Sequence, residues 1–342
     1  WQYAYRFSHF RGAAIMGAIS AIDIALWDIA GKYLGVPAYQ LLGGKCRDKA
    51  RVYCHVSGTT KEELLKGVVT AKTNGFTAVG HLTPFLDEPR DVPYFQTHVN
   101  KMRDAIETVR AYREAVGDAV DLCIEIHRRL TPAEAVVLAR GIEEFHPFFY
   151  EDPILPENFD SMGLVAQLIG IPIATGERLH SIHEFEMLLS RGAVQYVRPD
   201  VCMAGGLTHT KKIAALAEAH YVGVVPHNPL GPVSTAACLQ LAACIPNFAL
   251  QEYPSLEPMA PKSDIVKKPP KVEDGFLIID DSPGIGVELS EDAQEKYLRF
   301  AIEGGTRRPK NRAIVVPGQA TRLNRYGNLS RNFIKNMLAK PN

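Results

Sequence analysis

The segments LCIEIH (122–127), FFYEDP (148–153) and IPIATGE (171–177) decide the fold. Each apolar run ends at a glutamate, namely Glu125, Glu151 and Glu177, and the interval between successive acids is 26 residues in both cases. A period of this size accommodates a buried strand followed by an amphipathic helix, the crossover that parallel strands require. The spacing therefore predicts an α/β fold of the TIM-barrel type, with these carboxylates at one mouth, at the C-terminal ends of neighbouring strands.

The same period extends in both directions from this stretch. Runs that predict strands precede it at RVYCHVSG (51–58) and FTAVGHL (76–82), and follow it at VQYVRPD (194–200), GVVPHN (223–228) and FALQEY (248–253). With the three runs above they give eight strands, the number that closes a barrel whose interior side chains fill it. We expect the barrel, with its site, to occupy residues 51–255.

The two ends of the chain lie outside this period. Within residues 1–50, a helical segment contains a stripe at helical spacing that we expect to pack in the core: Ala18, Ile22, Ala25, Leu26 and Ile29. Residues 256–342 begin with a Pro- and Lys-rich stretch, and FLIIDDSPGIGVEL (276–289) then predicts a strand and turn packing back on the rest of the protein. Residues 307–342 hold nine Lys or Arg and no acid, which indicates a solvated or interface-lining tail or, alternatively, an anion or subunit contact.

Composition limits the function classes. The chain has 342 residues with 38 basic and 38 acidic side chains, so its zero formal charge gives no support to a nucleic-acid or membrane-surface role. We find no signal peptide at the start and no apolar run approaching the length of a membrane span. The six cysteines form no CxxC pair, which indicates reduced core thiols in a cytoplasmic protein.

Three carboxylates at one mouth require a counter-charge, because like charges in a partly dry site repel and take up protons. A divalent cation meets this requirement, and an all-oxygen ligand set favours Mg²⁺ or Mn²⁺ over Zn²⁺. We therefore expect Glu125, Glu151 and Glu177 to be metal ligands. The alternative is that they are three unrelated surface acids.

Two histidines accompany these acids. Asp200 and His227 end the sixth and seventh predicted strands, which are neighbours, so Asp200 is expected to orient His227 as a catalytic base. His127 lies two residues after Glu125 and therefore faces the same side of its strand. Because the third and seventh strands lie across the barrel from each other, His127 and His227 are predicted on either side of a bound substrate.

The motifs that carry this pattern also resemble a known family. AISAIDIALWDIAGK, IEIH, FYEDP, TGERLHS, RPDVCMAGGLTHTKKIA, PHNPLGP and LQEY are similar to the enolase superfamily, in particular its mandelate racemase branch and the galactonate and gluconate dehydratases within it. The resemblance covers residues 13–286. It implies a modified (β/α)7β barrel with the remnant of an α+β capping domain at the two ends. The rest of that cap either precedes the sequence given or is absent from a shortened homologue, and water exclusion and specificity depend on it.

The resemblance implies a Mg²⁺-dependent dehydratase that removes the α-proton of an aldonic acid and eliminates water to give a 2-keto-3-deoxy acid. His127 is then the general acid that protonates the departing 3-hydroxyl, or alternatively a metal-shell or structural histidine. Glu252, if protonated, is a hydrogen-bond donor to the enediolate, or else structural. Arg178 and His180 follow a ligand directly and are candidates for substrate contact. The family usually has Asp where this chain has Glu125, which leaves the effect on metal affinity open.

Several alternatives stay open. Racemases of this branch resemble one another in a Lys-x-Lys pair where this chain has Gly80 and Leu82, so a two-base racemase is not expected. His81, between them, is expected to be structural. A cycloisomerase or epimerase acting through the same enediolate remains an alternative, as does an inactive barrel kept for assembly. The sequence does not select one sugar acid as the small-molecule substrate, and the resemblance implies a homo-oligomer between dimer and octamer.

Overall fold

The computed structural model describes residues 1–85, 97–291 and 293. Residues 1–288 form one compact unit, which contains every residue discussed below. The predicted basic tail, residues 307–342, lies outside the described residues.

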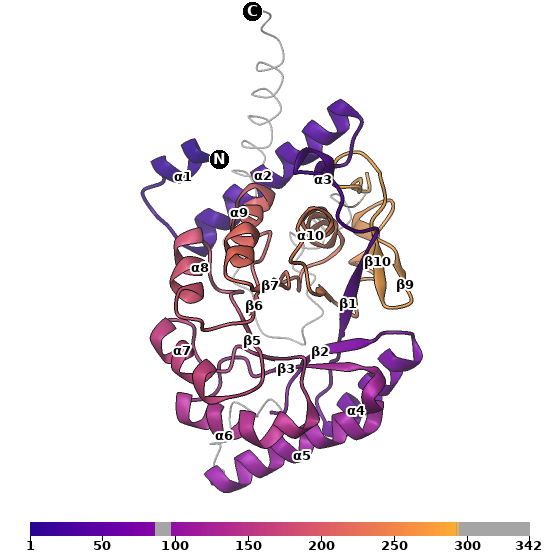
Figure 1. The fold of residues 1–342 in the computed structure, drawn as a ribbon. Coiled ribbons are helices and arrows are strands. Elements are labelled where there is room, and N and C mark those ends of the chain that lie inside the picture. The colour runs from indigo at the N-terminus through magenta and orange to yellow at the C-terminus, as the bar shows by residue number, and fades with distance from the viewer. Residues whose placement is uncertain (86–96, 292, 294–342) are drawn as a thin grey trace, which may run out of the picture. The chain divides into compact units, whose positions relative to one another are not determined.

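Eight parallel strands form the closed ring that the 26-residue interval predicts (Figure 1). They are β1 (Lys49–His55), β2 (Ala78–Leu82), β3 (Asp121–Glu125), β4 (Phe149–Glu151), β5 (Ile173–Thr175), β6 (Tyr196–Val197), β7 (Gly223–Val224) and β8 (Gln251–Tyr253). Neighbours pair in chain order from β1 to β7, and β8 pairs with β1. Val224 closes the ring by bridging Phe248, and the Ala249 amide donates to the Val224 carbonyl at 2.9 Å.

Each crossover between successive strands contains a helix, as right-handed βαβ connections require. The helices are α4 (Lys61–Thr73), α5 (His98–Val116), α6 (Pro132–Ile142), α7 (Phe159–Leu168), α8 (Ile182–Leu189), α9 (Gly206–Ala219) and α10 (Pro232–Cys244), with short 3-10 turns at Gly117–Ala119 and Glu143–Phe145. Capping boxes at Thr131 with Glu134 and at Ser181 with Glu184 satisfy the free amides that begin α6 and α8. These caps set where the chain turns from loop into helix.

The strand β8 is followed by a different kind of connection. A 3-10 turn (Ser263–Ile265) leads to β9 (Val272–Glu273) and β10 (Phe276–Ile278), an antiparallel hairpin that pairs with the start of β1. The architecture is therefore the (β/α)7β barrel, and the strand and turn expected at 276–289 do pack back on the barrel.

Three helices precede the barrel: α1 (Gln2–Phe7), α2 (Ala13–Leu34) and α3 (Ala38–Leu41). The prediction of which face of α2 is buried was wrong, because all five residues of the predicted core stripe are exposed. The buried residues are Met16, Ile19, Ser20, Asp23, Ile24 and Gly31. Helical periodicity identifies a face but not its partner, and here the partner requires small and polar groups.

The buried face of α2 docks on the start of α9 through hydrogen bonds. Ser20 Oγ accepts from the amides of Gly205 at 2.9 Å and Gly206 at 3.1 Å, and Asp23 Oδ2 accepts from the Thr208 amide at 3.0 Å. Helix α9 has no side-chain cap of its own, so α2 satisfies its first amides. Gly206 has φ +75°, and a Cβ there would lie 2.3 Å from Asp23 Oδ2, so the close approach requires glycine.

Among the described residues, α2 is the one helix long and apolar enough to cross a membrane. This is weak evidence of insertion, because core helices of soluble proteins pass the same test. The buried hydrogen bonds of Ser20 and Asp23 to α9 favour a helix of the folded domain.

The docking of α2 can be tested with Ser20→Ala. The change removes the acceptor of the buried Gly205 amide and one of two acceptors of the Gly206 amide, which also donates to the Val201 carbonyl at 3.2 Å. We therefore expect the free energy of unfolding to fall by about 1–3 kcal/mol. Chemical denaturation measures this. Ser20 Oγ also donates to the Met16 carbonyl, four residues earlier, at 2.6 Å. Ser8→Ala is the matched control, because Ser8 Oγ donates in the same way to the Ala4 carbonyl at an exposed position. Equal stability of the two variants would contradict the role assigned to Ser20.

Candidate active site

One residue per strand lies at the mouth, two residues after a residue that fills the barrel interior. The interior layer is Tyr53, Ala78, Cys123, Phe149, Ala174, Tyr196, Val225 and Leu250. Two residues further along the chain lie His55, Gly80, Glu125, Glu151, Gly176, Arg198, His227 and Glu252. Because side chains of a strand alternate between faces, the apolar layer forms the floor beneath a polar ring.

A cavity of about 170 Å³ opens above this floor. Its lining residues are Tyr53, His55, His81, Glu125, His127, Glu151, Glu177, His227, Pro229 and Glu252. The three predicted ligands, both predicted catalytic histidines and Glu252 are thus brought together. Asp200 lies behind His227.

The glutamates reach this cavity through strand register. Glu125 pairs with Glu151 across β3 and β4, and Glu177 follows the end of β5 by two residues. Burial and the neighbouring Glu151 raise the pKa of Glu125 well above its usual range. Burial also raises the pKa of Glu151 to about 8, against the opposing effect of Arg198. The bare anionic forms of Glu125 and Glu151 are therefore disfavoured.

The donor set fits a hard divalent cation. Within the described residues no hydrogen-bond donor reaches Glu151 Oε2, although that oxygen is buried. An unsatisfied buried carboxylate oxygen beside a second buried carboxylate is costly in the absence of a cation. The oxygen-only trio of Glu125, Glu151 and Glu177 has the chemistry of a Mg²⁺ or Mn²⁺ site.

Two arginines that the sequence analysis missed balance part of this charge. Arg198 is fully buried, with Nε 2.5 Å from Glu151 Oε1 and Nη2 2.6 Å from Glu252 Oε2. Arg128 Nη1 lies 2.7 Å from Asp152 Oδ2 and also contacts Glu177.

Arg198 could have been found by alternation, since it lies two residues before Asp200 and two after the interior Tyr196. Arg128 and Asp152 have positive φ, +65° and +41°, in turns after strands, so strand alternation does not predict where they point.

Asp200 and His227 form the predicted dyad. The two residues bridge β6 and β7 at their ends, and His227 Nδ1 lies 2.8 Å from Asp200 Oδ2. The Cys202 amide donates to Asp200 Oδ1 at 2.7 Å and fixes the carboxylate. His227 Nε2 faces the cavity, 3.3 Å from Glu177 Oε2. Burial lowers the pKa of His227, but Glu252, Asp200 and Glu177 together raise it to about 9.

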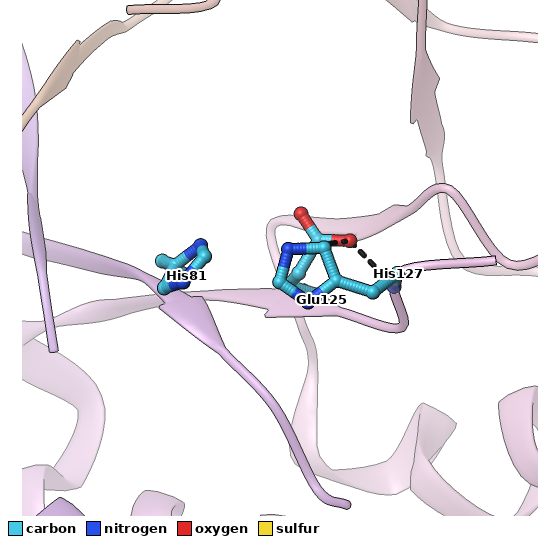
Figure 2. A group of neighbouring side chains, drawn as sticks. All are labelled: His81, Glu125 and His127. Atoms are coloured by element: carbon cyan, nitrogen blue, oxygen red, sulfur yellow. Dashed lines mark hydrogen bonds and ion pairs between the residues drawn. The ribbon is translucent and has the colours of Figure 1, made fainter. Parts of the chain in front are cut away.

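Three histidine rings lie in a row on the opposite side of the cavity. His55 stacks on His81 with ring centroids 4.9 Å apart, and His81 meets His127 edge-on at 4.8 Å. The His127 amide donates to Glu125 Oε1 at 2.6 Å (Figure 2). Although His81 was expected to be structural, its ring lines the cavity. The pairing of β2 with β3 shifts register between Val79 and Leu82, and this bulge turns the His81 ring toward the mouth beside Gly80.

Glu252 is the most heavily bonded acid of the site. Its Oε1 lies 2.6 Å from His55 Nε2, and its Oε2 accepts from Arg198 and from the Asn228 amide at 2.7 Å. Burial opposes ionisation, but Arg198 and His227 hold the pKa of Glu252 well below its usual range. These partners favour the ionised form, whereas the predicted hydrogen-bond donor requires the protonated form.

Arg178 and His180 do not line the cavity. Arg178 Nη2 pairs with Glu157 Oε1 at 2.8 Å, and the His180 amide donates to Glu184 Oε2 at 2.9 Å. Their contact with a substrate stays a prediction.

A buried polar chain continues from Glu252 away from the cavity. The Asn228 side-chain amide donates to Thr235 Oγ1 at 2.7 Å, and Thr235 donates to Glu257 Oε2 at 2.6 Å. Burial raises the pKa of Glu257 to about 7, although Thr235 and Lys262 oppose this rise. Glu257 thus supports the strand end that carries Glu252.

This network predicts a pH dependence of stability. The folded protein holds the Glu257 proton up to about pH 7, whereas the unfolded chain loses it near 4.5, so the associated stability is present at low pH and is lost as pH rises through about 7. Relative to Glu257→Gln, the wild type should lose up to about 3 kcal/mol between about pH 5 and pH 8 in urea unfolding. For the exposed control Glu62→Gln, the difference in free energy of unfolding from the wild type should not change with pH. A constant difference for Glu257→Gln would contradict the assignment.

Comparisons with known proteins agree with this fold. Residues 69–293 match the family described as enolase C-terminal domain-like, and residues 1–43 match the N-terminal domain of mandelate racemase/muconate lactonizing enzymes. A D-galactonate dehydratase of Variovorax paradoxus is 38% identical over 311 residues, covering 85% of this chain and 76% of the relative. The D-galactonate dehydratase of Pectobacterium atrosepticum is 37% identical over 311 residues, with the same coverage of both chains.

Solved structures show the same fold. A member of the enolase superfamily from Salmonella Typhimurium is 32% identical with a TM-score of 0.76, covering 84% of this chain and 78% of that chain. A mandelate racemase/muconate lactonizing enzyme-like protein from Roseovarius sp. TM1035 is 32% identical with a TM-score of 0.77, covering 84% of this chain and 74% of that one. The chain belongs to the mandelate racemase/muconate lactonizing enzyme family of the enolase superfamily.

Proposed function

We propose that this protein is a Mg²⁺-dependent hydro-lyase that converts an aldonic acid of the galactonate type into a 2-keto-3-deoxy acid. The observation that carries the proposal is the placement of His127 and His227 on one cavity with three glutamates that fit a hard cation. The relatives named D-galactonate dehydratase support the choice of substrate class.

Glu125, Glu151 and Glu177 would hold the cation. When bound, Mg²⁺ supplies positive charge to the substrate carboxylate and to the negative charge that develops as the α-proton leaves. Glu177 belongs to both the ligand set and the group of acids that raise the pKa of His227. Neutralising Glu177 therefore helps His227 lose its proton and become a base.

His227 is the base in this proposal. Its Nε2 faces the cavity while Asp200 holds Nδ1, so Nε2 is the atom that takes the C2 proton. Asp200 stabilises the imidazolium that results and fixes the orientation of the ring.

His127 is the acid. As the C3–O bond breaks, His127 gives its proton to the leaving hydroxyl, which departs as water, and the resulting enol takes a proton at C3 to give the 2-keto acid. His127 is 28% exposed, enough to reach a substrate in the cavity. Arg198 and His55 hold Glu252 ionised in the wall of the cavity, where it can accept a hydrogen bond from a substrate hydroxyl.

The geometry also bears on the alternative reactions. A side chain at position 80 would place its Cβ 2.2 Å from the Tyr53 ring, so the first lysine of the Lys-x-Lys pair has no room here unless Tyr53 moves. An epimerase or cycloisomerase acting through the same enediolate needs no acid at the leaving hydroxyl. We propose further that the enzyme is cytoplasmic and forms a homo-oligomer, as the family resemblance implies.

Product mass tests the reaction type. With Mg²⁺ and D-galactonate, and with other C5 and C6 aldonic acids as a panel, we expect a product lighter by the mass of one water. His127→Asn and His227→Asn should each lower kcat by about 10²–10⁴-fold. His9→Asn, at an exposed position, is the control and should retain activity. A product of unchanged mass would support the isomerase instead, and full activity of both variants would refute the assigned roles.

Metal binding can be measured without turnover. Mg²⁺ at 100 times its dissociation constant should stabilise the wild type by about 2.7 kcal/mol, and EDTA should reverse the effect. Glu177→Gln should abolish most of this stabilisation, whereas the exposed Glu144→Gln should not. No effect of Mg²⁺ on the wild type would favour the inactive barrel.

A further inference from the structure

A second set of metal-ligating side chains lies in the cavity beside the glutamates. Donor atoms of His81, Glu125 and His127 all lie within 4.8 Å of one another, the one such group of three among the described residues. Figure 2 shows the Glu125 carboxylate next to His127, with the His81 ring beside them. His127 Nε2 is 4.0 Å from Glu125 Oε1.

The chemistry of this trio differs from that of the three glutamates. Two imidazole nitrogens and one carboxylate oxygen form a mixed ligand set, which suits Zn²⁺ and other first-row transition metals and not Mg²⁺. Metal–nitrogen distances near 2 Å require donor atoms closer together than those seen here. Small rotations of the two partly exposed histidine side chains provide that approach, since neither ring is fully buried.

The backbone prepares the trio in two ways. His81 and His127 both have φ +53°, a conformation uncommon outside glycine, and at His81 the bulge of β2 turns the ring into the mouth. His55, stacked on His81, is itself held by Glu252 at 2.6 Å. His55 therefore supports one face of the His81 ring by stacking.

We propose that His81, Glu125 and His127 form a binding site for a Zn²⁺-class cation, distinct in ligands from the three-glutamate set. The two sets share Glu125, so a cation in one site lowers the affinity of the other. Occupation of the mixed site also engages His127. The binding claim stands apart from the proposed dehydration, because it concerns metal affinity alone.

Co²⁺ is a suitable probe, because its visible absorption reports nitrogen ligation whereas Zn²⁺ is colourless. Tag-free full-length wild type, titrated with Co²⁺, should show one saturable absorption band that Zn²⁺ removes. His81→Asn and His127→Asn should each weaken Co²⁺ binding by at least about tenfold. Glu177→Gln, which alters the glutamate set alone, should keep the band, and so should the exposed control His9→Asn.

The outcomes separate the sites. If Co²⁺ bound equally well to wild type and to both histidine variants, or if Glu177→Gln abolished the band, Co²⁺ would occupy the three-glutamate set and the proposal would be wrong. Circular dichroism confirms that each variant is folded. Should one histidine variant fail to fold, the other decides the question. Dehydratase activity enters none of these measurements, so failure here and failure of the proposed function are distinguishable.

Discussion

The fully buried ion pairs of Arg198 with Glu151 and Glu252 are the interaction on which the mouth of this barrel depends. Arg198 is 1% exposed, and its side chain spans the distance from β4 to β8 across the interior. Removing one partner of a buried charge pair typically costs about 3–5 kcal/mol, because the other charge is left uncompensated. One guanidinium thus lets Glu151, a proposed metal ligand, and Glu252 lie buried at the same cavity.

The apolar layer beneath the mouth also limits which side chains fit around the cavity. Tyr53 lies under the cavity and occupies the space that a side chain at position 80 would need. It also approaches the Arg198 guanidinium, whose carbon is 5.6 Å from the ring centroid. The same ring therefore supports the buried cation and removes one place for a second base.

Much of this could be predicted from the sequence, because barrel geometry has a strict period. The interval between Glu125, Glu151 and Glu177 predicted the strands, and the pairing of Asp200 with His227 followed from neighbouring strand ends. Features that break the period could not be predicted. His81 enters the cavity through a bulge, and Arg128 turns inward through a positive φ. The buried face of α2 was misassigned because its partner binds through Ser20 and Asp23, which an apolar stripe does not reveal.

The division of labour between the two histidines is the central claim, and isotope exchange tests it most directly. We would incubate His127→Asn with Mg²⁺ and D-galactonate in D₂O and follow C2 by mass spectrometry and NMR. The account predicts that deuterium enters C2 without loss of water, because His227 still removes the proton while the acid is missing. His227→Asn should show neither exchange nor dehydration. Exchange at the wild-type rate in His227→Asn would show that another group is the base and would contradict the account.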